Sequence, residues 1–233
     1  MLEVNELETA YGSSQVLFGV TLDVGEGEVV ALLGRNGAGK TTTLSSIMGL
    51  VPPQGGRIMF RDQPIIGLEP YEISRLGIGI VPENARLFAS LTVEENFETA
   101  RRPATDGHSR FGLDEVLDLF PDLQTLLGRR AGMLSGGQQR MVAVARTLVG
   151  NPDLLLLDEP SEGLAPRIVG ALLDRLKHLR ATGMTVLLSE QNLRFANELA
   201  DRAYVMEKGE IRYTGSIAAL AAEPDIRLRY LMV

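Results

Sequence analysis

The sequence predicts an α/β fold built on a mostly parallel sheet, with an antiparallel β-subdomain at the N-terminus and an inserted helical subdomain. Short apolar runs at 28–33 and 154–157 have the length of buried strands. They alternate with segments of helical period, such as 166–180, where Pro begins the segment and leucines recur on one face. Strands separated by such helices pair in parallel. Strands at 2–10 and 16–24, joined by a tight turn, predict the antiparallel part.

The rest of the chain continues this alternation. Two edge strands are predicted at 57–60 and 65–66, and further strands at 78–81, 185–188, 202–207 and 211–214. Helices are predicted from about Lys40 and at 192–199, with Ser216 as the N-cap of a last helix.

Residues 86–150 are predicted to form the inserted helical subdomain of one domain that spans 1–233. Apolar residues recur there at helical spacing: Leu87, Leu91, Val93, Phe97, Val116, Leu117, Leu119 and Phe120. A polar connection at 101–111 separates the two groups, and Asn151-Pro152 marks the return to the α/β body.

The composition excludes several classes of protein. With 233 residues and 45% hydrophobic content, the chain is long enough to bury a core. Its net charge of −7 argues against a nucleic-acid partner, and the lack of cysteine excludes disulfides and thiolate chemistry. No apolar run approaches the roughly 18 residues that a membrane-spanning helix needs, and no signal peptide is visible.

A phosphate-binding loop follows the first buried run. The pattern of two glycines, lysine and threonine is matched by Gly34, Arg35, Asn36, Gly37, Ala38, Gly39, Lys40 and Thr41, with Thr42 next. Glycines let consecutive backbone N–H groups point at phosphate oxygens, and a helix that begins there adds its positive dipole end. Lys40 would reach the β- and γ-phosphates, and the Thr41 hydroxyl would bind Mg²⁺.

Two acids end the strand predicted at 154–157. Ligands of open α/β sheets bind at the carboxyl ends of the strands, so Asp158 and Glu159 are expected at the nucleotide. Asp158 would hold Mg²⁺, largely through water, and Glu159 would act as the general base on the attacking water.

A second glycine-rich turn, at 134–140, opens another helix. Its candidate residues are Ser135, Gly136, Gly137 and Gln138. A Ser hydroxyl and Gly amides at a helix N-terminus form an anion site. Since the first loop already supplies one such site, the second is most useful as a clamp on the γ-phosphate of a nucleotide bound to another subunit. An N-cap before an ordinary core helix is the alternative.

Both glycine motifs, the acidic strand and their order resemble the ATP-binding-cassette (ABC) ATPases, over essentially the whole chain. That resemblance implies a P-loop NTPase fold, ATP and Mg²⁺ as cofactors, and two cassettes that sandwich two ATP molecules head to tail. It also implies that Tyr11 stacks on adenine; the alternative is a turn residue that packs locally.

The chain departs from the usual family pattern at three positions. Glu83 stands where the family has a glutamine near the metal, Ala165 where it has an aspartate, and Gln191 where it has the switch histidine. Neutral drift is the alternative explanation for each. The chain's two histidines, His108 and His178, are interpreted as solvated residues that do not take the place of the switch histidine.

Together these departures resemble one of the two ATPases of bacterial branched-chain amino-acid importers. The segments that carry this resemblance are 81–83, 91–96, 161–166 and 190–192. It implies a second, non-identical cassette, or a homodimer in isolation. It also implies integral membrane permease subunits that contact residues 83–97, and a periplasmic substrate-binding protein. The chain would then lie at the cytoplasmic face of the inner membrane. Urea or short-chain amide import, export, a non-transport cassette and an ATP clamp without turnover stay as alternatives.

Overall fold

A computed structural model describes residues 1–102, 111–223 and 225–226. Its larger sheet has six strands in the order β10-β9-β3-β8-β7-β6. Five of them pair in parallel: β3 (Val29–Leu33), β6 (Ile78–Val81), β7 (Leu154–Asp158), β8 (Thr185–Glu190) and β9 (Arg202–Glu207). Only β10 (Glu210–Ser216) is antiparallel to its neighbour β9. The parallel sheet predicted from the alternating pattern is therefore confirmed.

The second sheet is antiparallel and has the order β2-β1-β4-β5. It contains β1 (Leu2–Tyr11), β2 (Ser14–Val24), β4 (Gly55–Phe60) and β5 (Gln63–Pro64). The predicted edge position of 57–60 is wrong, because β4 lies between β1 and β5. The strand predicted at 65–66 is also displaced. Arg61 and Asp62 both have positive φ, which makes a two-residue hairpin turn, so β5 begins directly after it.

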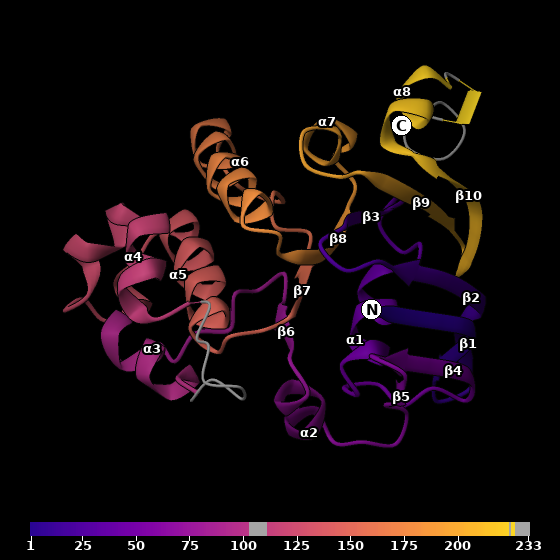
Figure 1. The fold of residues 1–233 in the computed structure, drawn as a ribbon, viewed down its shortest axis with the longest axis horizontal. Coiled ribbons are helices and arrows are strands. Elements are labelled where there is room, and N and C mark those ends of the chain that lie inside the picture. Colours follow the sequence, from indigo (N-terminus) through magenta and orange to yellow (C-terminus); the bar gives the residue numbers. More distant parts are fainter. Residues whose placement is uncertain (103–110, 224, 227–233) are drawn as a thin grey trace.

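The segment predicted as the helical subdomain contains α3 (Val93–Ala100), α4 (Leu113–Leu119), two 3₁₀ turns (Pro121–Leu126 and Ala131–Met133) and α5 (Gly136–Val149). In Figure 1 these helices lie on one side of the parallel sheet and the antiparallel sheet lies on the other. Leu87 and Leu91 precede α3 rather than belong to it, because a capping box between Thr92 and Glu95 starts that helix at Val93. Most of the predicted polar connection, 103–110, is outside the described residues, as is His108.

The remaining helices are α1 (Lys40–Ile47), α2 (Pro70–Arg75), α6 (Pro166–Ala181), α7 (Leu193–Asn197) and α8 (Ile217–Ala222). The predicted leucine face of α6 is confirmed by burial of Leu172, Leu176 and Leu179. The cap of α8 is confirmed as well, since Ser216 accepts from the N–H of Ala219 at 3.1 Å. The helix predicted at 192–199 is shorter at both ends, because Asn192 caps it from outside.

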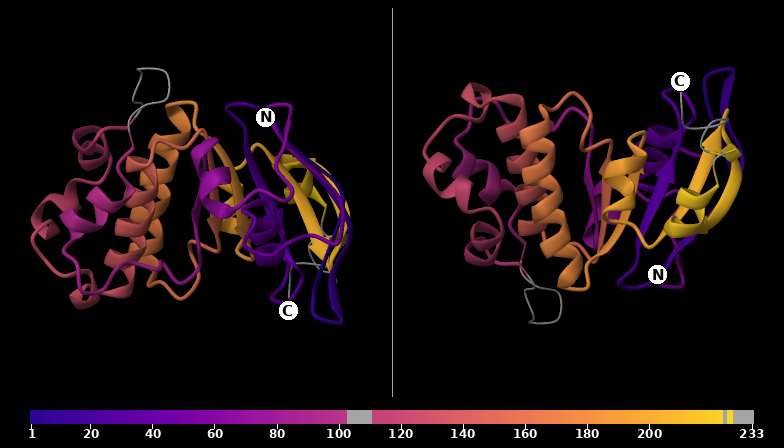
Figure 2. Two further views of the ribbon diagram at one scale, coloured as in Figure 1. Left: turned by 90° about the horizontal axis from the view of Figure 1, so that it is seen from below. Right: turned by 90° about the horizontal axis from the view of Figure 1, so that it is seen from above.

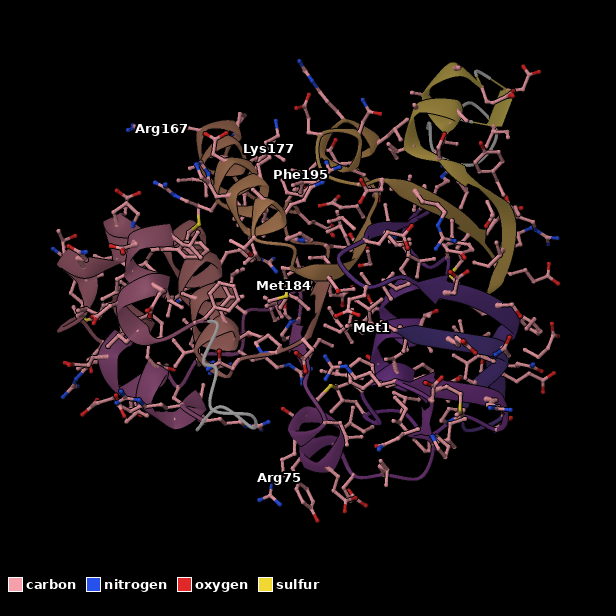
Figure 3. All side chains as sticks on the ribbon, in the orientation of Figure 1. Met1, Arg75, Arg167, Lys177, Met184 and Phe195 are labelled. Carbon is pink, nitrogen blue, oxygen red and sulfur yellow. The ribbon has the colours of Figure 1, made fainter. Side chains whose placement is uncertain are left out.

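Two apolar clusters cover the two faces of the parallel sheet, and alternate residues of each buried strand enter different clusters. In β7, Leu155 and Leu157 pack with α5, α6 and α7, whereas Leu154 and Leu156 pack with α1 and the antiparallel sheet. Figure 2 shows the resulting layers, and Figure 3 labels Met184 and Phe195 in the first cluster. Burial on both faces explains why these strands read as continuous apolar runs. Among the described helices, none combines the length and apolar character needed to span a bilayer.

Gly209, in the turn between β9 and β10, ties the two sheets to the phosphate loop. Its N–H donates to the carbonyl of Ala38 at 2.8 Å, and its carbonyl accepts from the N–H of Phe18 at 2.9 Å. Its φ is +79°, and a Cβ added there would lie 1.9 Å from the carbonyl oxygen of Val16. A side chain therefore cannot be accommodated without moving β2.

We expect Gly209→Ala to lower the free energy of unfolding by about 2–4 kcal/mol, since backbone strain of about 1–3 kcal/mol is joined by a backbone clash. Urea unfolding followed by circular dichroism measures it. Gly12→Ala is the matched control, because Gly12 also has positive φ but a Cβ there meets nothing within 4 Å. Equal losses in the two variants would contradict the clash.

Candidate nucleotide site

The phosphate loop connects β3 to α1. Gly37 and Gly39 have φ of +79° and +111°, the left-handed region that favours glycine. Gly34 and Gly39 also allow close packing: an added Cβ would lie 2.5 Å from the Met206 carbonyl oxygen at Gly34, and 2.8 Å from Leu17 Cδ2 at Gly39. No side chain caps α1. The first N–H groups of this helix are therefore free of a capping side chain and available to an anion.

The Lys40 side chain is buried and lies against the loop that precedes it. Its ammonium donates to the carbonyls of Gly34 at 2.8 Å and Arg35 at 3.1 Å. It also forms an ion pair with Glu159, with 2.9 Å between Nζ and Oε1. Lys40 follows β3 and Glu159 follows β7, and β8 lies between these two strands. The residues predicted to serve phosphate and water thus meet across an intervening strand. Phosphate oxygens would compete with Glu159 for this ammonium.

Thr41 and Asp158 place two oxygen ligands side by side. The Thr41 hydroxyl donates to Asp158 Oδ1 at 3.0 Å, and the Ser189 hydroxyl donates to the same oxygen at 2.6 Å. Burial raises the pKa of Asp158, and these two hydrogen bonds oppose the rise. In the described part of the chain no three His, Cys, Asp or Glu side chains form a metal cluster. The donor set suits Mg²⁺, which takes one or two carboxylates together with nucleotide phosphates and water.

Glu159 begins the turn after β7 with a positive φ of +44°. Its N–H is held by Ser189, through the carbonyl at 3.0 Å and the hydroxyl at 3.1 Å. Burial alone would raise the pKa of the Glu159 carboxyl, but hydrogen bonds from Glu162 and Lys40 and the charge of Lys40 hold that pKa below its ordinary value. The group is therefore ionised near neutral pH, as a general base must be.

Glu162 is an acid that sequence reasoning missed. Its hydrogen bond to Glu159, burial and the charge of Glu159 raise its pKa to about 7. It lines an open pocket with Asn36, Glu159 and Gln191. Glu162 lies four residues after Asp158 in a loop. A loop has no periodic pattern, so the sequence did not indicate that Glu162 would contact Glu159.

Gln191 follows β8 and is half-buried in this pocket, so the structure brings it together with Glu159. Glu83 is exposed and lines a second pocket with Thr41 and Asp158, on the side predicted for a metal ligand. Tyr11 is 51% exposed at the hairpin that joins β1 to β2. No hydrogen bond of Tyr11 with the phosphate loop is present in the described residues.

The turn at 134–140 forms the start of α5. Ser135 is its N-cap and makes a capping box with Gln138: Ser135 Oγ accepts from the Gln138 N–H at 3.4 Å, and Gln138 Oε1 accepts from the Ser135 N–H at 3.0 Å. Ser135 and Gly136 are exposed. Gly137 lies against α6, where an added Cβ would be 2.7 Å from Ile168 Cγ2. Within the described chain, no hydrogen bond or ion pair joins this turn to the phosphate loop.

Two further sequence predictions concern Ala165 and His178, which both belong to or cap α6. Ala165 is the N-cap of α6 and makes no capping hydrogen bond, which an aspartate there could make. His178 is exposed, and its Nδ1 lies 2.7 Å from the Asp174 carbonyl oxygen of the same helix. It lines neither of the pockets described above, and its exposure agrees with the prediction of a solvated residue.

The parallel sheet, the glycine loop before α1 and the acids at the end of β7 define a P-loop NTPase. The family model described as ABC transporter matches residues 17–162. The chain belongs to this family, and it is an ABC transporter ATPase whose ATP hydrolysis is coupled to transport. ATPase subunits of this family act with membrane permeases and dimerise.

Full-length relatives narrow the comparison. The chain is 43% identical over 231 residues to the high-affinity branched-chain amino acid transport ATP-binding protein BraG of Pseudomonas aeruginosa, covering 99% of each chain. It is 36% identical to the probable branched-chain amino acid transport ATP-binding protein LivF of Archaeoglobus fulgidus, covering 93% of this chain and 92% of LivF. The lipopolysaccharide export system ATP-binding protein LptB of Escherichia coli is 34% identical, with coverage of 99% and 96%.

Solved structures agree with the fold. An ATP-binding cassette of an ABC transporter in its ADP conformation superimposes with a TM-score of 0.83 at 28% identity, covering 97% of this chain and 96% of that one. A dimeric cassette in a post-hydrolysis state with ADP and phosphate gives 0.80 at 27% identity, covering 93% and 99%.

Proposed function

We propose that this chain hydrolyses Mg-ATP to drive a bacterial importer of branched-chain, hydrophobic amino acids. The observation that carries the ATPase part is the convergence of Lys40 and Thr41, which follow β3, with Asp158 and Glu159 at the end of β7. The substrate class is supported by BraG and LivF, which are similar over nearly the whole chain.

The proposed roles follow the geometry. The loop from Gly34 to Thr42 holds the phosphates, Tyr11 stacks on adenine, and Thr41, Asp158 and Glu83 serve Mg²⁺. Glu159 is the general base, and the Gln191 amide contacts the γ-phosphate or the attacking water. When bound, Mg²⁺ neutralises charge that develops on the phosphates. The residues Ser135 to Gln138 complete the site of a second cassette. ATP binding closes this pair at the cytoplasmic face of the membrane, and the permease contacts 83–97.

Reconstitution tests the substrate. The chain is purified with its membrane subunits and second cassette, placed in proteoliposomes, and assayed with the cognate binding protein and leucine, urea or acetamide. Of the three compounds, we expect only leucine to stimulate ATP hydrolysis and to accumulate on the side of the membrane that carries the cassettes. Stimulation by urea or acetamide without leucine identifies an amide importer. Outward movement of a lipid identifies an exporter, a candidate kept because LptB is similar over 99% of the chain.

Removing the Ser135 hydroxyl tests the clamp between subunits. In a dimer with Ser135→Ala in one cassette, turnover should fall about 10–100-fold at the partner's site, since a hydrogen bond to a charged group contributes about 1.5–3 kcal/mol. ATP binding to the variant's own phosphate loop should be unchanged. Single-turnover hydrolysis with each site inactivated in turn measures both quantities.

Ser216→Ala is the matched control, because Ser216 is also an N-cap serine with a backbone partner. Each substitution should cost about 1 kcal/mol of stability. Only Ser135→Ala should slow hydrolysis. Equal turnover in the two variants would leave Ser135 as an ordinary N-cap.

Because of Gln191, the rate of ATP hydrolysis at this site should fall less at acidic pH than the rate at a histidine-containing site. An amide gains no charge near neutral pH, whereas histidine titrates near 6.5. We expect Gln191→His to add an inactivating limb between about pH 6 and 7 to the kcat profile. Glu162 lines the same pocket and has a pKa of about 7, so its titration is already part of the parent profile, and the added limb is the difference between the two profiles. Superimposable profiles would refute the idea.

A further inference from the structure

Glu190, the last residue of β8, is a buried carboxylate without a cation partner. It is 2% exposed, and none of the ion pairs in the described chain includes it. Its carboxylate accepts hydrogen bonds from three backbone N–H groups: Ser161 at 3.1 Å on Oε1, Gln191 at 3.1 Å and Asn192 at 3.0 Å on Oε2. The Ser161 side chain also hydrogen-bonds this carboxyl group. Burial raises the pKa of Glu190, and the hydrogen bonds from Ser161 and Asn192 oppose that rise. Burying a carboxyl group is costly, so its presence here calls for an explanation beyond packing.

The three N–H groups belong to two separate segments of the site. Ser161 lies two residues after Glu159, whereas Gln191 and Asn192 begin the segment after β8. The backbone carbonyl of Glu190 also accepts from the Gly34 N–H at 3.3 Å, at the start of the phosphate loop. One residue therefore contacts the three segments that carry Lys40, Glu159 and Gln191.

We propose that Glu190 is a positioning residue for ATP hydrolysis: its carboxylate fixes the spacing between the Glu159 segment and the Gln191 segment. This inference rests on the proposed ATPase role of Glu159. With the spacing fixed, Glu159 and Gln191 line one pocket together. A general base must lie within hydrogen-bond reach of the water it activates, so a small change in this spacing slows the chemical step.

The geometry requires a carboxylate rather than an amide. Both oxygens of Glu190 accept, one toward each segment, whereas glutamine offers a single acceptor and an NH₂ group. In Glu190→Gln the NH₂ group would face an N–H donor on one side. The substitution keeps side-chain size, so it removes the acceptor toward one of the two segments with little change in packing.

We expect Glu190→Gln to lower kcat about 10–100-fold and to leave the dissociation constant for ATP within about threefold of the parent, because the phosphate loop still binds the nucleotide. Binding is measured with Mg-ATP in a Glu159→Gln background, so that hydrolysis does not interfere. Hydrogen exchange should accelerate at the amides of Ser161 or of Gln191 and Asn192, while β8 keeps its protection.

Glu28→Gln is the matched control. Glu28 lies just before β3. Its carboxylate also accepts from a backbone N–H, that of Gly25 at 2.8 Å, and it pairs with Arg202. This variant should lose stability without a change in kcat below its melting temperature. If Glu190→Gln instead loses kcat and ATP affinity by the same factor, or keeps parental exchange at Ser161, Gln191 and Asn192, the positioning role is wrong.

The exchange measurement separates this inference from the proposed function. If the parent protein with its partner subunits shows no hydrolysis that depends on Glu159, the proposed function fails, and exchange still decides whether Glu190 holds the two segments. If Glu190→Gln does not fold, Glu190→Asp provides the second variant. Aspartate keeps two acceptors but is one methylene shorter, so it should hold one segment only and show faster exchange on the other side.

Discussion

Glu159→Gln should bind ATP and hydrolyse it about 10²–10⁴-fold more slowly than the parent, because general-base catalysis contributes about that factor. The amide has the size of the carboxylate but cannot accept the proton of the attacking water. It also releases Lys40 from its 2.9 Å ion pair. Since ATP no longer has to displace a carboxylate from Lys40, the affinity for ATP should rise. Equilibrium binding and single-turnover hydrolysis measure the two effects.

Two outcomes would contradict this assignment. Substantial retained turnover would exclude Glu159 as the base. Weaker ATP binding would show that Glu159 supports the nucleotide rather than competes with it for Lys40. Glu198→Gln is a control for loss of one negative charge, since Glu198 pairs with Lys177 on the surface. Lys177 is labelled on α6 in Figure 3.

Lys40→Ala should weaken ATP binding by about 100-fold or more, because two or more hydrogen bonds to charged phosphates are lost at about 1.5–3 kcal/mol each. The variant also leaves Glu159 without its cation. The free energy of unfolding should fall by about 1–3 kcal/mol, less than for a fully enclosed pair because the pocket opens to solvent. Isothermal titration calorimetry and urea unfolding provide the measurements.

The stability loss in Lys40→Ala should depend on pH in a defined direction. In the parent, the pKa of Glu159 is held below its ordinary value, so the ion pair adds stability above about pH 4.5 that is lost as pH falls through the folded pKa. In the variant the two contributions of Lys40 that lower this pKa are lost, so the pKa of Glu159 is higher than in the parent and the carboxylate adds less stability above about pH 4.5. The difference between the two proteins should therefore be larger at pH 7 than at pH 4.

A double variant gives the control for this interpretation. Lys40→Ala with Glu159→Gln removes both charges and should recover part of the stability, although not ATP binding. Lys177→Ala, which breaks an exposed pair, should cost at most about 1 kcal/mol. An equal loss at pH 4 and pH 7 would show that Lys40 acts through packing rather than charge.

Local sequence predicted much of the site because its parts are local. The glycines at 34–39 prescribe a loop before a helix, and Asp158 and Glu159 end an apolar run, so parallel pairing alone brings both to one edge of the sheet. The interior place of β4 was not predictable, since it depends on pairing with β1. Glu162 and Glu190 were missed for a related reason. Glu190 reaches Ser161, which lies 29 residues away in the sequence, and Glu162 meets Glu159 through an aperiodic loop.

The hydrogen bonds of Glu190 have a consequence for how such proteins diverge. Its carboxylate contacts main-chain N–H groups at positions 161, 191 and 192, and every amino acid except proline supplies one. The side chains at positions 191 and 192 can therefore change over evolutionary time while the spacing of the segments is kept. Histidine and glutamine can thus exchange at position 191 on an unchanged scaffold, and the chemistry of hydrolysis can vary separately from the geometry that supports it.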